Sequence, residues 1–414
     1  MARPTVARIN LDALIYNVEA IRRVIGNRKI CAAVKADAYG HGAPIVCHAL
    51  AMAGVHMLAV AMTEEAIDLR EAGIDKPIIL LTTVPTEDIR LTLDYGIIAC
   101  VTDEGFAREL SSQALKRGTV ALAHVNVDTG MHRVGLDWER AALNILRMSR
   151  LGGLRITGLF SHFACSDADD LGFSREQVRR FRSVLWQLRR AGMRLPFVHM
   201  ANSNGVLRLP EAHFDGVRPG LVLYGLYPRE DVRSVVHLKP VLSMRTRISQ
   251  RRSVREGEKI GYGHTFTTWR ESVIGTLPVG YHDGFIRQFS NAGEVLVRGR
   301  RAPVVGRVCM DQTLVDITDV PGARTGDEVV IYGEQGGERI SVEEMARRVD
   351  GISHELTCAV GRRVRREFVL NGAVVVETPL RSVVQGAALS RILGTSAASP
   401  HEKLRRTPRK RGAA

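Results

Sequence analysis

Short β-branched runs alternate with helical stretches between residues 29 and 225, and this alternation constrains the fold of the 414-residue chain more than any other feature. The runs are apolar throughout, as in the strands of a parallel sheet covered by helices. Eight of them with intervening helices predict an α/β fold with a (β/α)8 barrel of the TIM type, and a doubly wound open sheet is the alternative. The predicted strands are 29–36, 56–62, 77–83, 97–102, 120–128, 156–163, 197–202 and 216–225.

One of the connecting helices has readable ends. Ser174 can cap its start, with Gln177 three residues later, and Gly192 follows the last turn. Apolar residues at helical spacing predict a buried face, with the arginines on the outer face; the buried positions are Val178, Phe181, Leu185 and Leu188.

A change of pattern near residue 235 predicts a second domain. Beyond it, long β-rich segments are separated by turns with Gly and Pro, which is typical of antiparallel sheets. We therefore expect a barrel over residues 1–235 and a C-terminal, mostly antiparallel β domain over 236–372. Residues 373–414, rich in Ser, Ala and Pro with a dense basic cluster, are expected to form a disordered, solvated tail.

Composition excludes several classes of protein. No apolar run approaches the roughly 18 to 20 residues that a membrane-spanning helix needs, and the amino terminus lacks a secretory pattern, so a cytoplasmic location is expected. Six cysteines without close pairs indicate neither a disulfide framework nor a zinc site, and no metal is expected. The net charge of +14 comes largely from arginines spread along helices and from the tail, so a nucleic-acid partner is not favoured.

Lys35 ends an apolar strand and precedes a glycine-rich turn. An ammonium that faces a strand-lined interior loses hydration, and a desolvated lysine is the usual amine for Schiff-base chemistry. The alternative is a lysine whose ammonium reaches solvent past the strand end.

The segment Ala33-Val-Lys35-Ala-Asp-Ala-Tyr39-Gly-His-Gly42 resembles the lysine motif of the alanine racemase family, whose cofactor is pyridoxal 5'-phosphate (PLP). Further motifs occur in the family's order, and the resemblance spans roughly residues 6 to 370. These motifs are Val127-Asp-Thr-Gly-Met-His-Arg133-Val-Gly, Ser161-His162-Phe, His199-Met-Ala-Asn202-Ser203, Val217-Arg218-Pro-Gly220, Gly261-Tyr262-Gly, Val279-Gly-Tyr281 and Gly306-Arg-Val-Cys-Met310-Asp311-Gln.

The resemblance implies a PLP-dependent isomerase that interconverts L-alanine and D-alanine. It places Arg218 opposite the pyridine nitrogen of PLP, and a guanidinium only donates hydrogen bonds, so the ring is a weak electron sink that favours racemisation. By resemblance, PLP is held by Lys35, Tyr39, His162, Asn202, Ser203, Arg218, Gly220, Leu221 and His354.

Racemisation needs acid–base groups on two faces of the substrate, and the resemblance assigns these roles to Lys35 and Tyr262. In the family this tyrosine reaches the barrel of a second chain, which implies a head-to-tail homodimer with composite sites. The resemblance assigns the substrate pocket to Arg133, which binds the carboxylate, and to Tyr281, Met310 and Asp311.

Three departures from the family pattern leave alternatives open. Asn126 stands where many members carry a carbamylated lysine that orients Arg133, His354 replaces a tyrosine, and His282 replaces an alanine. A broader racemase of small amino acids or serine therefore remains an alternative. A decarboxylase of the same architecture is disfavoured by Arg218, and a non-catalytic PLP-binding protein by the β domain. D-Alanine supply for peptidoglycan is the family expectation, and a catabolic role stays open.

Overall fold

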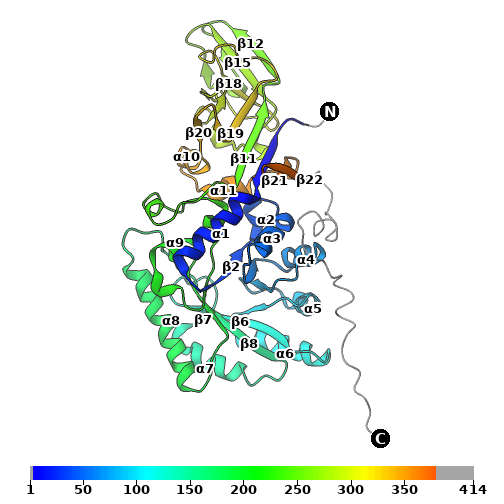
Figure 1. Cartoon of the computed structure of the whole chain (residues 1–414), viewed down its shortest axis with the longest axis vertical. Coiled ribbons are helices and arrows are strands. Elements are labelled where there is room, and N and C mark those ends of the chain that lie inside the picture. The colour runs from blue at the N-terminus through cyan, green and yellow to red at the C-terminus, as the bar shows by residue number, and fades with distance from the viewer. Residues whose placement is uncertain (1–2, 379–414) are drawn as a thin grey trace.

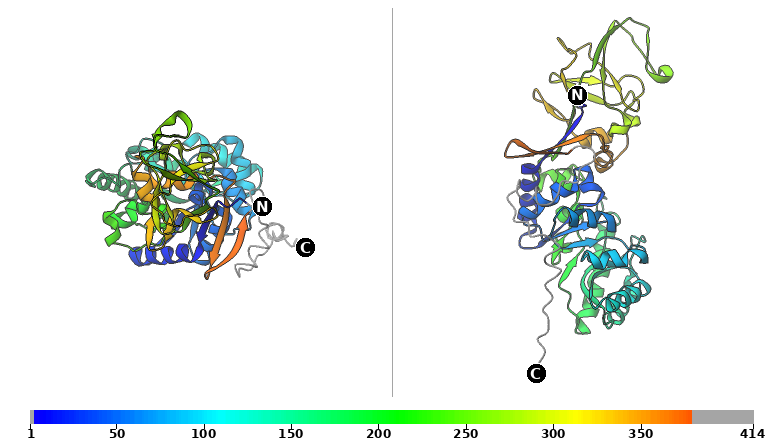
Figure 2. Two further views of the ribbon diagram at one scale, coloured as in Figure 1. Left: turned by 90° about the horizontal axis from the view of Figure 1, so that it is seen from above. Right: turned by 90° about the vertical axis from the view of Figure 1, so that its right-hand side faces the viewer.

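The computed structural model describes residues 3–378, which form a barrel and a β-rich domain stacked along the long axis of the molecule (Figure 1). The barrel takes up the lower half of that view, and the N-terminal strand runs up beside the β domain. Figure 2 shows the same elongated arrangement from the side. Residues beyond 378 contain most of the predicted basic tail and lie outside the described residues.

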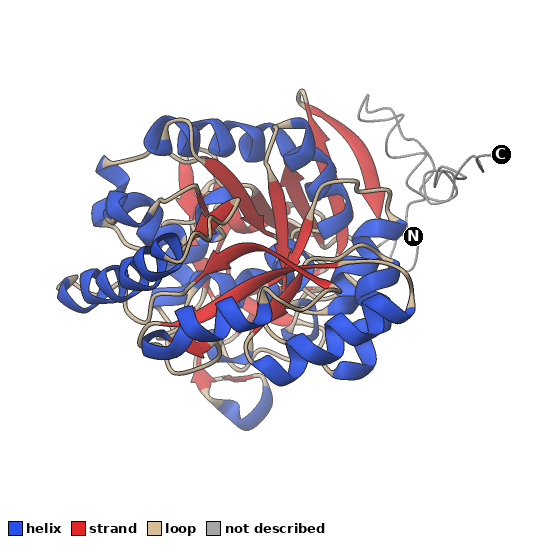
Figure 3. Ribbon diagram, turned by 90° about the horizontal axis from the view of Figure 1, so that it is seen from below, coloured by secondary structure: helices blue, strands red, loops and turns tan. Residues whose placement is uncertain are grey.

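The barrel is built from parallel strands in the order β4-β3-β2-β10-β9-β8-β6-β5, and a parallel bridge between Ile79 and Ile98 closes it. Every strand falls within or beside one of the eight predicted runs, so the predicted barrel is confirmed. Viewed from below, helices surround the strands (Figure 3). The strands are β2 (Lys29–Ala33), β3 (Met57–Val60), β4 (Ile78–Leu80), β5 (Ala99–Val101), β6 (Ala121–Asp128), β8 (Leu154–Phe160), β9 (Phe197–His199) and β10 (Gly216–Val217), and β7 (Leu136–Asp137) pairs with β6 outside this order.

The longer helices of the barrel bury an apolar face against the strands, whereas α2 is a single short turn with left-handed residues. Their bounds are α1 (Leu11–Ile25), α2 (Lys35–Gly40), α3 (Ala43–Met52), α4 (Thr63–Glu71), α5 (Ile89–Asp94), α6 (Glu104–Lys116), α7 (Trp138–Met148), α8 (Gly172–Arg190) and α9 (Ser203–Arg208). In α8 the predicted apolar face is fully packed, but the predicted cap is wrong. The helix begins two residues before Ser174, because the Asp170 carboxylate accepts from the Gly172 N–H and starts the helix earlier.

The second domain is organised around a mostly antiparallel sheet of order β17-β16-β19-β11-β1-β21-β22. Two short helices, α10 (Val342–Arg347) and α11 (Ser353–Cys358), return towards the barrel. The strands are β11 (Leu242–Arg247), β12 (Gln250–Val254), β13 (Lys259–Ile260), β14 (Phe266–Thr267), β15 (Ser272–Leu277), β16 (Glu294–Val297), β17 (Arg300–Pro303), β18 (Thr313–Asp316), β19 (Glu328–Gln335), β20 (Glu338–Ile340), β21 (Arg365–Leu370) and β22 (Ala373–Thr378).

Both ends of this sheet differ from the predicted boundaries. Strand β1 (Val6–Asn10) pairs antiparallel with β11 and parallel with β21, so the first strand of the chain belongs to the β domain rather than to the barrel. At the other end, Asn371 and Gly372 form the turn of a hairpin rather than the end of the domain, and β22 continues the sheet. Among the described residues, no helix is long and apolar enough to cross a membrane.

Candidate active site

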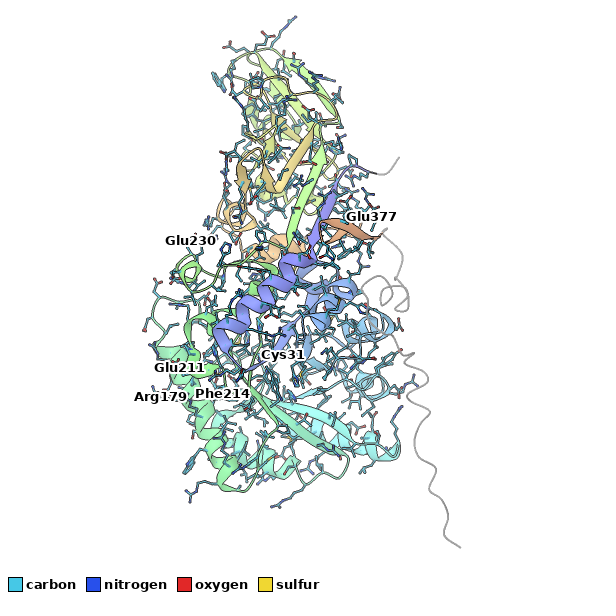
Figure 4. All side chains as sticks on the ribbon, viewed as in Figure 1. Cys31, Arg179, Glu211, Phe214, Glu230 and Glu377 are labelled. Carbon is cyan, nitrogen blue, oxygen red and sulfur yellow. The ribbon has the colours of Figure 1, made fainter. Side chains whose placement is uncertain are left out.

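A cavity of about 760 Å³ lies at the carboxyl ends of the barrel strands, where α10 and α11 of the β domain cover them. Catalytic groups of parallel barrels gather at this end. The cavity is lined by the predicted cofactor residues, namely Lys35, Tyr39, His162, Asn202, Ser203, Arg218, Gly220, Leu221 and His354. Glu230 lines its outer part where the two domains meet (Figure 4).

The backbone that carries Lys35 forms a left-handed turn. Strand β2 stops at Ala33 rather than including Lys35, and the residues from Ala36 to Tyr39 all have φ between 53° and 56°. Each left-handed L-residue costs roughly 1–2 kcal/mol, so four in succession need external support. Lys35 and Tyr39, at the two ends of this turn, both line the cavity.

Four side chains supply that support. Glu65 accepts a hydrogen bond of 2.6 Å from the Ala36 N–H, and the Nδ1–H of His41 donates to the carbonyl oxygens of Ala38 and Tyr39, both at 2.9 Å. Within the turn, the Asp37 carboxylate accepts from Ala43 N–H at 2.7 Å. From the β domain, Arg366 donates to the Gly40 carbonyl at 3.1 Å and lies 3.5 Å from the Asp37 carboxylate.

The electrostatic surroundings of Lys35 favour the neutral amine. Burial, and then the positive charges of Arg133 and Arg218, lower the pKa of Lys35 below its usual value, while the Glu65 carboxylate opposes this shift. A lysine amine that loses its proton more easily is a better base and a better nucleophile towards a carbonyl.

Arg218 is buried at the base of the cavity and is held by acceptors alone. Its guanidinium donates to the Ser161 carbonyl at 2.8 Å, to His162 Nδ1 at 3.0 Å and to His199 Nδ1 at 2.8 Å. Burial lowers the pKa of Arg218 to about 10, so it keeps its charge at neutral pH. Burial and the Arg218 charge together lower the pKa of His162 to about 3, so His162 is neutral and carries its hydrogen on Nε2.

The residues predicted to hold a phosphate form a compact group. The Gly220 N–H donates to Ser203 Oγ at 3.0 Å, which leaves the Ser203 hydroxyl hydrogen for a ligand. A Cβ at position 220 would lie 2.6 Å from the Tyr39 hydroxyl, so only glycine allows Tyr39 to come this close. His354 Nδ1 is buried without a hydrogen-bond partner among the described residues, and its ring lies 6.3 Å from that of Tyr39. These donors and the size of the cavity fit PLP.

Arg133 lies beside this cavity rather than in its lining. A small crevice joins it to Asn126 and His162, and it makes no hydrogen bond or ion pair with any residue between 3 and 378. Its charge nevertheless acts on Lys35 and His162. The guanidinium is therefore free to bind an anion next to Lys35.

Four predicted residues lie elsewhere, on the β domain. Tyr262, Tyr281 and Met310 are 72%, 41% and 51% exposed, and none of them lines the Lys35 cavity. Tyr281 N–H donates to the Cys309 carbonyl, and Asp311 forms a 2.7 Å ion pair with Arg363. Within one chain, therefore, the structure does not bring Tyr262 to Lys35.

Sequence reasoning missed several residues that position the site. Glu65 gives no signal in the sequence, because an acidic residue in the first turn of a helix such as α4 is ordinary. His199 stands in one of the sequence motifs without a predicted role of its own, yet it orients Arg218 and donates from Nε2 to His124 Nδ1 at 3.1 Å. Gln177, predicted as part of a cap, instead donates to the His162 carbonyl at 3.0 Å.

Comparison with known proteins identifies the family to which the chain is similar. The profile of the alanine racemase N-terminal domain matches residues 9–228, and that of the C-terminal domain matches residues 241–368. The chain belongs to the alanine racemase family. Alanine racemase 2 of Caldanaerobacter subterraneus is 44% identical over 90% of this chain and 96% of its own length, and the Halothermothrix orenii alanine racemase is 43% identical over 89% and 97%.

Solved structures of family members share the fold. The alanine racemase of Clostridium difficile superimposes with a TM-score of 0.88 at 34% identity, covering 92% of this chain and all of that one. The enzyme of Streptomyces lavendulae gives a TM-score of 0.84 at 33% identity, covering 90% of this chain and 98% of that one. The resemblance inferred from the motifs is thus confirmed over both domains.

Proposed function

We propose that this chain is a PLP-dependent alanine racemase that interconverts L-alanine and D-alanine with Lys35 and Tyr262 as its two acid–base groups. The observation that carries the proposal is the juxtaposition of Lys35 with a buried, donor-only Arg218 in one cavity. Family membership supports the same activity.

PLP, when bound, withdraws electrons from the substrate α-carbon and so acidifies its C–H bond. Ser203, Tyr39, the Gly220–Leu221 backbone and His354 would hold its phosphate, and Lys35 would bind its aldehyde carbon. Arg218 would donate to the ring nitrogen, and its contacts with His162, His199 and Ser161 hold the guanidinium in place for that role. Because a guanidinium only donates hydrogen bonds, Arg218 could not accept one from a protonated ring nitrogen, so it would keep that nitrogen unprotonated and limit side reactions.

The acid–base step needs one group on each face of the substrate. Arg133 would bind the substrate carboxylate. The neutral Lys35 amine would take the α-proton from one face, and the Tyr262 phenol would give a proton to the other. Lys35 ends protonated and Tyr262 ends deprotonated, so the pair is then set for the reverse reaction.

A second chain is needed to place Tyr262 near Lys35. We propose a head-to-tail homodimer, because the exposed Tyr262, Tyr281 and Met310 have no function on an isolated β domain, and exposed aromatic and methionine side chains mark contact surfaces. In that assembly, Tyr262, Met310 and Asp311 of each chain would complete the partner's cavity. A cytoplasmic location and the supply of D-alanine for peptidoglycan belong to the same proposal.

Racemisation in D2O tests the proposal directly. Purified holoenzyme incubated with L-alanine should produce D-alanine labelled with deuterium at the α-carbon, while a Lys35→Ala variant should not. Tyr262→Phe should retain PLP but lose racemisation, and Tyr95→Phe, an alteration on the barrel far from the cavity, should leave it unchanged. Unchanged optical purity of either alanine enantiomer would refute the proposal, and release of carbon dioxide would indicate the decarboxylase alternative.

Because Asn126 departs from the family pattern, serine stays an alternative substrate that can be tested. Its amide brings no negative charge to Arg133, and the crevice between them adjoins His162. Rates on L-alanine and L-serine, measured under the same conditions, decide which substrate the pocket favours.

A further inference from the structure

A second cavity, of about 390 Å³, lies where the barrel meets the β domain. Its floor is made of buried side chains from both parts of the chain, including His41, Tyr224 and Tyr332. Its walls are partly apolar, with Leu226 and Ile340 among the lining residues. The volume is within the range of small-ligand sites.

His41 presents an unused acceptor to this cavity. Its Nδ1 lies 2.9 Å from two carbonyl oxygens, which only accept, so the ring hydrogen is on Nδ1. Burial lowers the pKa of His41 to about 4, and the ring is neutral at physiological pH. Its Nε2 therefore carries a bare lone pair, and this fully buried atom has no hydrogen-bond partner among residues 3–378.

Two donors in the same cavity are also unpaired. The Tyr332 side chain is 1% exposed, and its hydroxyl has no partner within the described chain. Arg245 uses Nη1 for a 2.6 Å contact with Glu328, but its buried Nε is unpaired. Buried polar atoms are rarely left without partners, and three of them around one cavity point to a polar ligand.

The charges around the cavity define that ligand further. Four cations line it, and three of them have carboxylate partners: Arg8 with Glu367, Arg245 with Glu328, and Arg339 with Glu334. The fourth, Lys239, has no carboxylate partner in the described part of the chain. The buried Glu343 also lines the cavity, and among residues 3–378 its carboxylate accepts only from the Tyr227 N–H, at 3.2 Å. Among the described residues, Lys239 and Glu343 thus line the cavity without a partner of opposite charge. A zwitterionic ligand would supply one charge for each of them.

We propose that this second cavity binds a free α-amino acid with an apolar side chain. Its ammonium group donates to His41 Nε2 and the Glu343 carboxylate, and its carboxylate accepts from the Tyr332 hydroxyl and Arg245 Nε. Lys239, which lines the same cavity, supplies the positive charge that balances the ligand carboxylate. The apolar wall residues receive the side chain. This inference goes beyond the proposed racemase activity, and binding does not depend on that activity.

Two residues connect this cavity to the Lys35 site, so a ligand bound here affects the groups around Lys35. His41 holds the left-handed turn by its hydrogen bonds to Ala38 and Tyr39. Glu343 lines both cavities. A bound amino acid therefore acts as an effector, which alters how firmly the Lys35 turn is held.

Isothermal titration calorimetry of the PLP-loaded enzyme with L-leucine, L-valine and L-methionine tests the site. We expect at least one of them to bind, and Tyr332→Phe, which removes only the unpaired hydroxyl, to weaken that binding at least tenfold without changing the KM for alanine. Arg245→Lys, which removes the unpaired Nε, should weaken it similarly, and Tyr95→Phe should not. Absence of heat with all three amino acids, equal binding by wild type and Tyr332→Phe, or a crystal soaked in the ligand that shows only water in the cavity would each overturn the proposal.

Discussion

Substitution of Glu65 tests how much the left-handed turn after Lys35 depends on hydrogen bonds to this carboxylate. Its two oxygens accept from three backbone N–H groups: Oε1 from Ala36 at 2.6 Å, and Oε2 from Ala61 at 2.8 Å and from Met62 at 3.3 Å. No other described side chain holds the Ala36 N–H, which is the first amide after Lys35. Glu65 therefore ties the start of the turn to the start of α4.

The size of the effect follows from these contacts. A hydrogen bond to a charged group contributes about 1.5–3 kcal/mol, and Glu65 is only half-buried, so we take the lower end of that range. Glu65→Ala should lower the free energy of unfolding by about 3–4 kcal/mol, and Glu65→Gln, which keeps one acceptor oxygen, by about 1.5 kcal/mol. The substitution also removes the charge that raises the pKa of Lys35, so that pKa should fall further.

Two assays measure the two expected effects, namely the loss of stability and the lower pKa of Lys35. The midpoint of urea unfolding reports the stability of the barrel, and the rate of PLP uptake by the cofactor-free protein against pH reports the neutral Lys35 amine. In Glu65→Gln the rise of uptake with pH should shift to lower pH, because the amine then loses its proton more easily. Glu64→Gln is the matched control, since Glu64 precedes Glu65 on α4, is exposed and makes no hydrogen bond in the described structure. If Glu65→Ala matched Glu64→Gln in both assays, the turn would not depend on this carboxylate and the reasoning would be refuted.

Three further predictions concern the rest of the molecule. Gly220→Ala should raise the Kd for PLP at least tenfold, because the new Cβ would lie 2.6 Å from the Tyr39 hydroxyl and displace it; an unchanged absorbance titration would contradict this. Asp283→Asn should cost about 3 kcal/mol in urea unfolding, since it removes the charge of a fully buried carboxylate that lies 2.7 Å from both Arg3 and Arg363, and Arg363 then keeps only Asp311 as an ion-pair partner; a wild-type midpoint would argue against it. The free energy of unfolding should also fall as pH drops below about 6.5, because four buried histidines stay neutral in the folded protein but become protonated on unfolding; they are His41, His124, His162 and His199. Each should contribute up to about 1.4 kcal/mol per pH unit. A stability that does not change between pH 7 and pH 5 would contradict this prediction.

The barrel could be predicted because its signal is local. Each strand is a short apolar run that must be buried on both faces, and the parallel arrangement brings all carboxyl ends to one mouth. Residues that follow strands, such as His162 after β8 and Asn202 after β9, therefore line the same cavity although they are far apart in the chain. Arg218 follows β10 in the same way.

The parts that could not be predicted depend on distant contacts. Ala36 and Ala38 have no intrinsic preference for positive φ, so their conformation depends on His41 directly after the turn and on Glu65 and Arg366 from other elements. The pairing of β1 with β11 and β21 is equally non-local, since an apolar strand at the start of a chain fits a barrel or a separate sheet equally well. Tyr262 is a further case, because only the proposed dimer would bring it to Lys35.

The charges around Lys35 favour a ligand that carries negative charge. Arg133 and Arg218 both act on Lys35, and Glu65 is the one carboxylate among the described groups that opposes them there. Arg218 is buried against neutral histidines and carbonyl oxygens, and none of the residues from 3 to 378 that hydrogen-bond to it carries a negative charge. A buried cation without such compensation is costly, and a ligand that brings negative charge relieves that cost on binding. The phosphate of PLP and the substrate carboxylate each bring such charge, and the Asn126 amide beside Arg133 leaves that task to them.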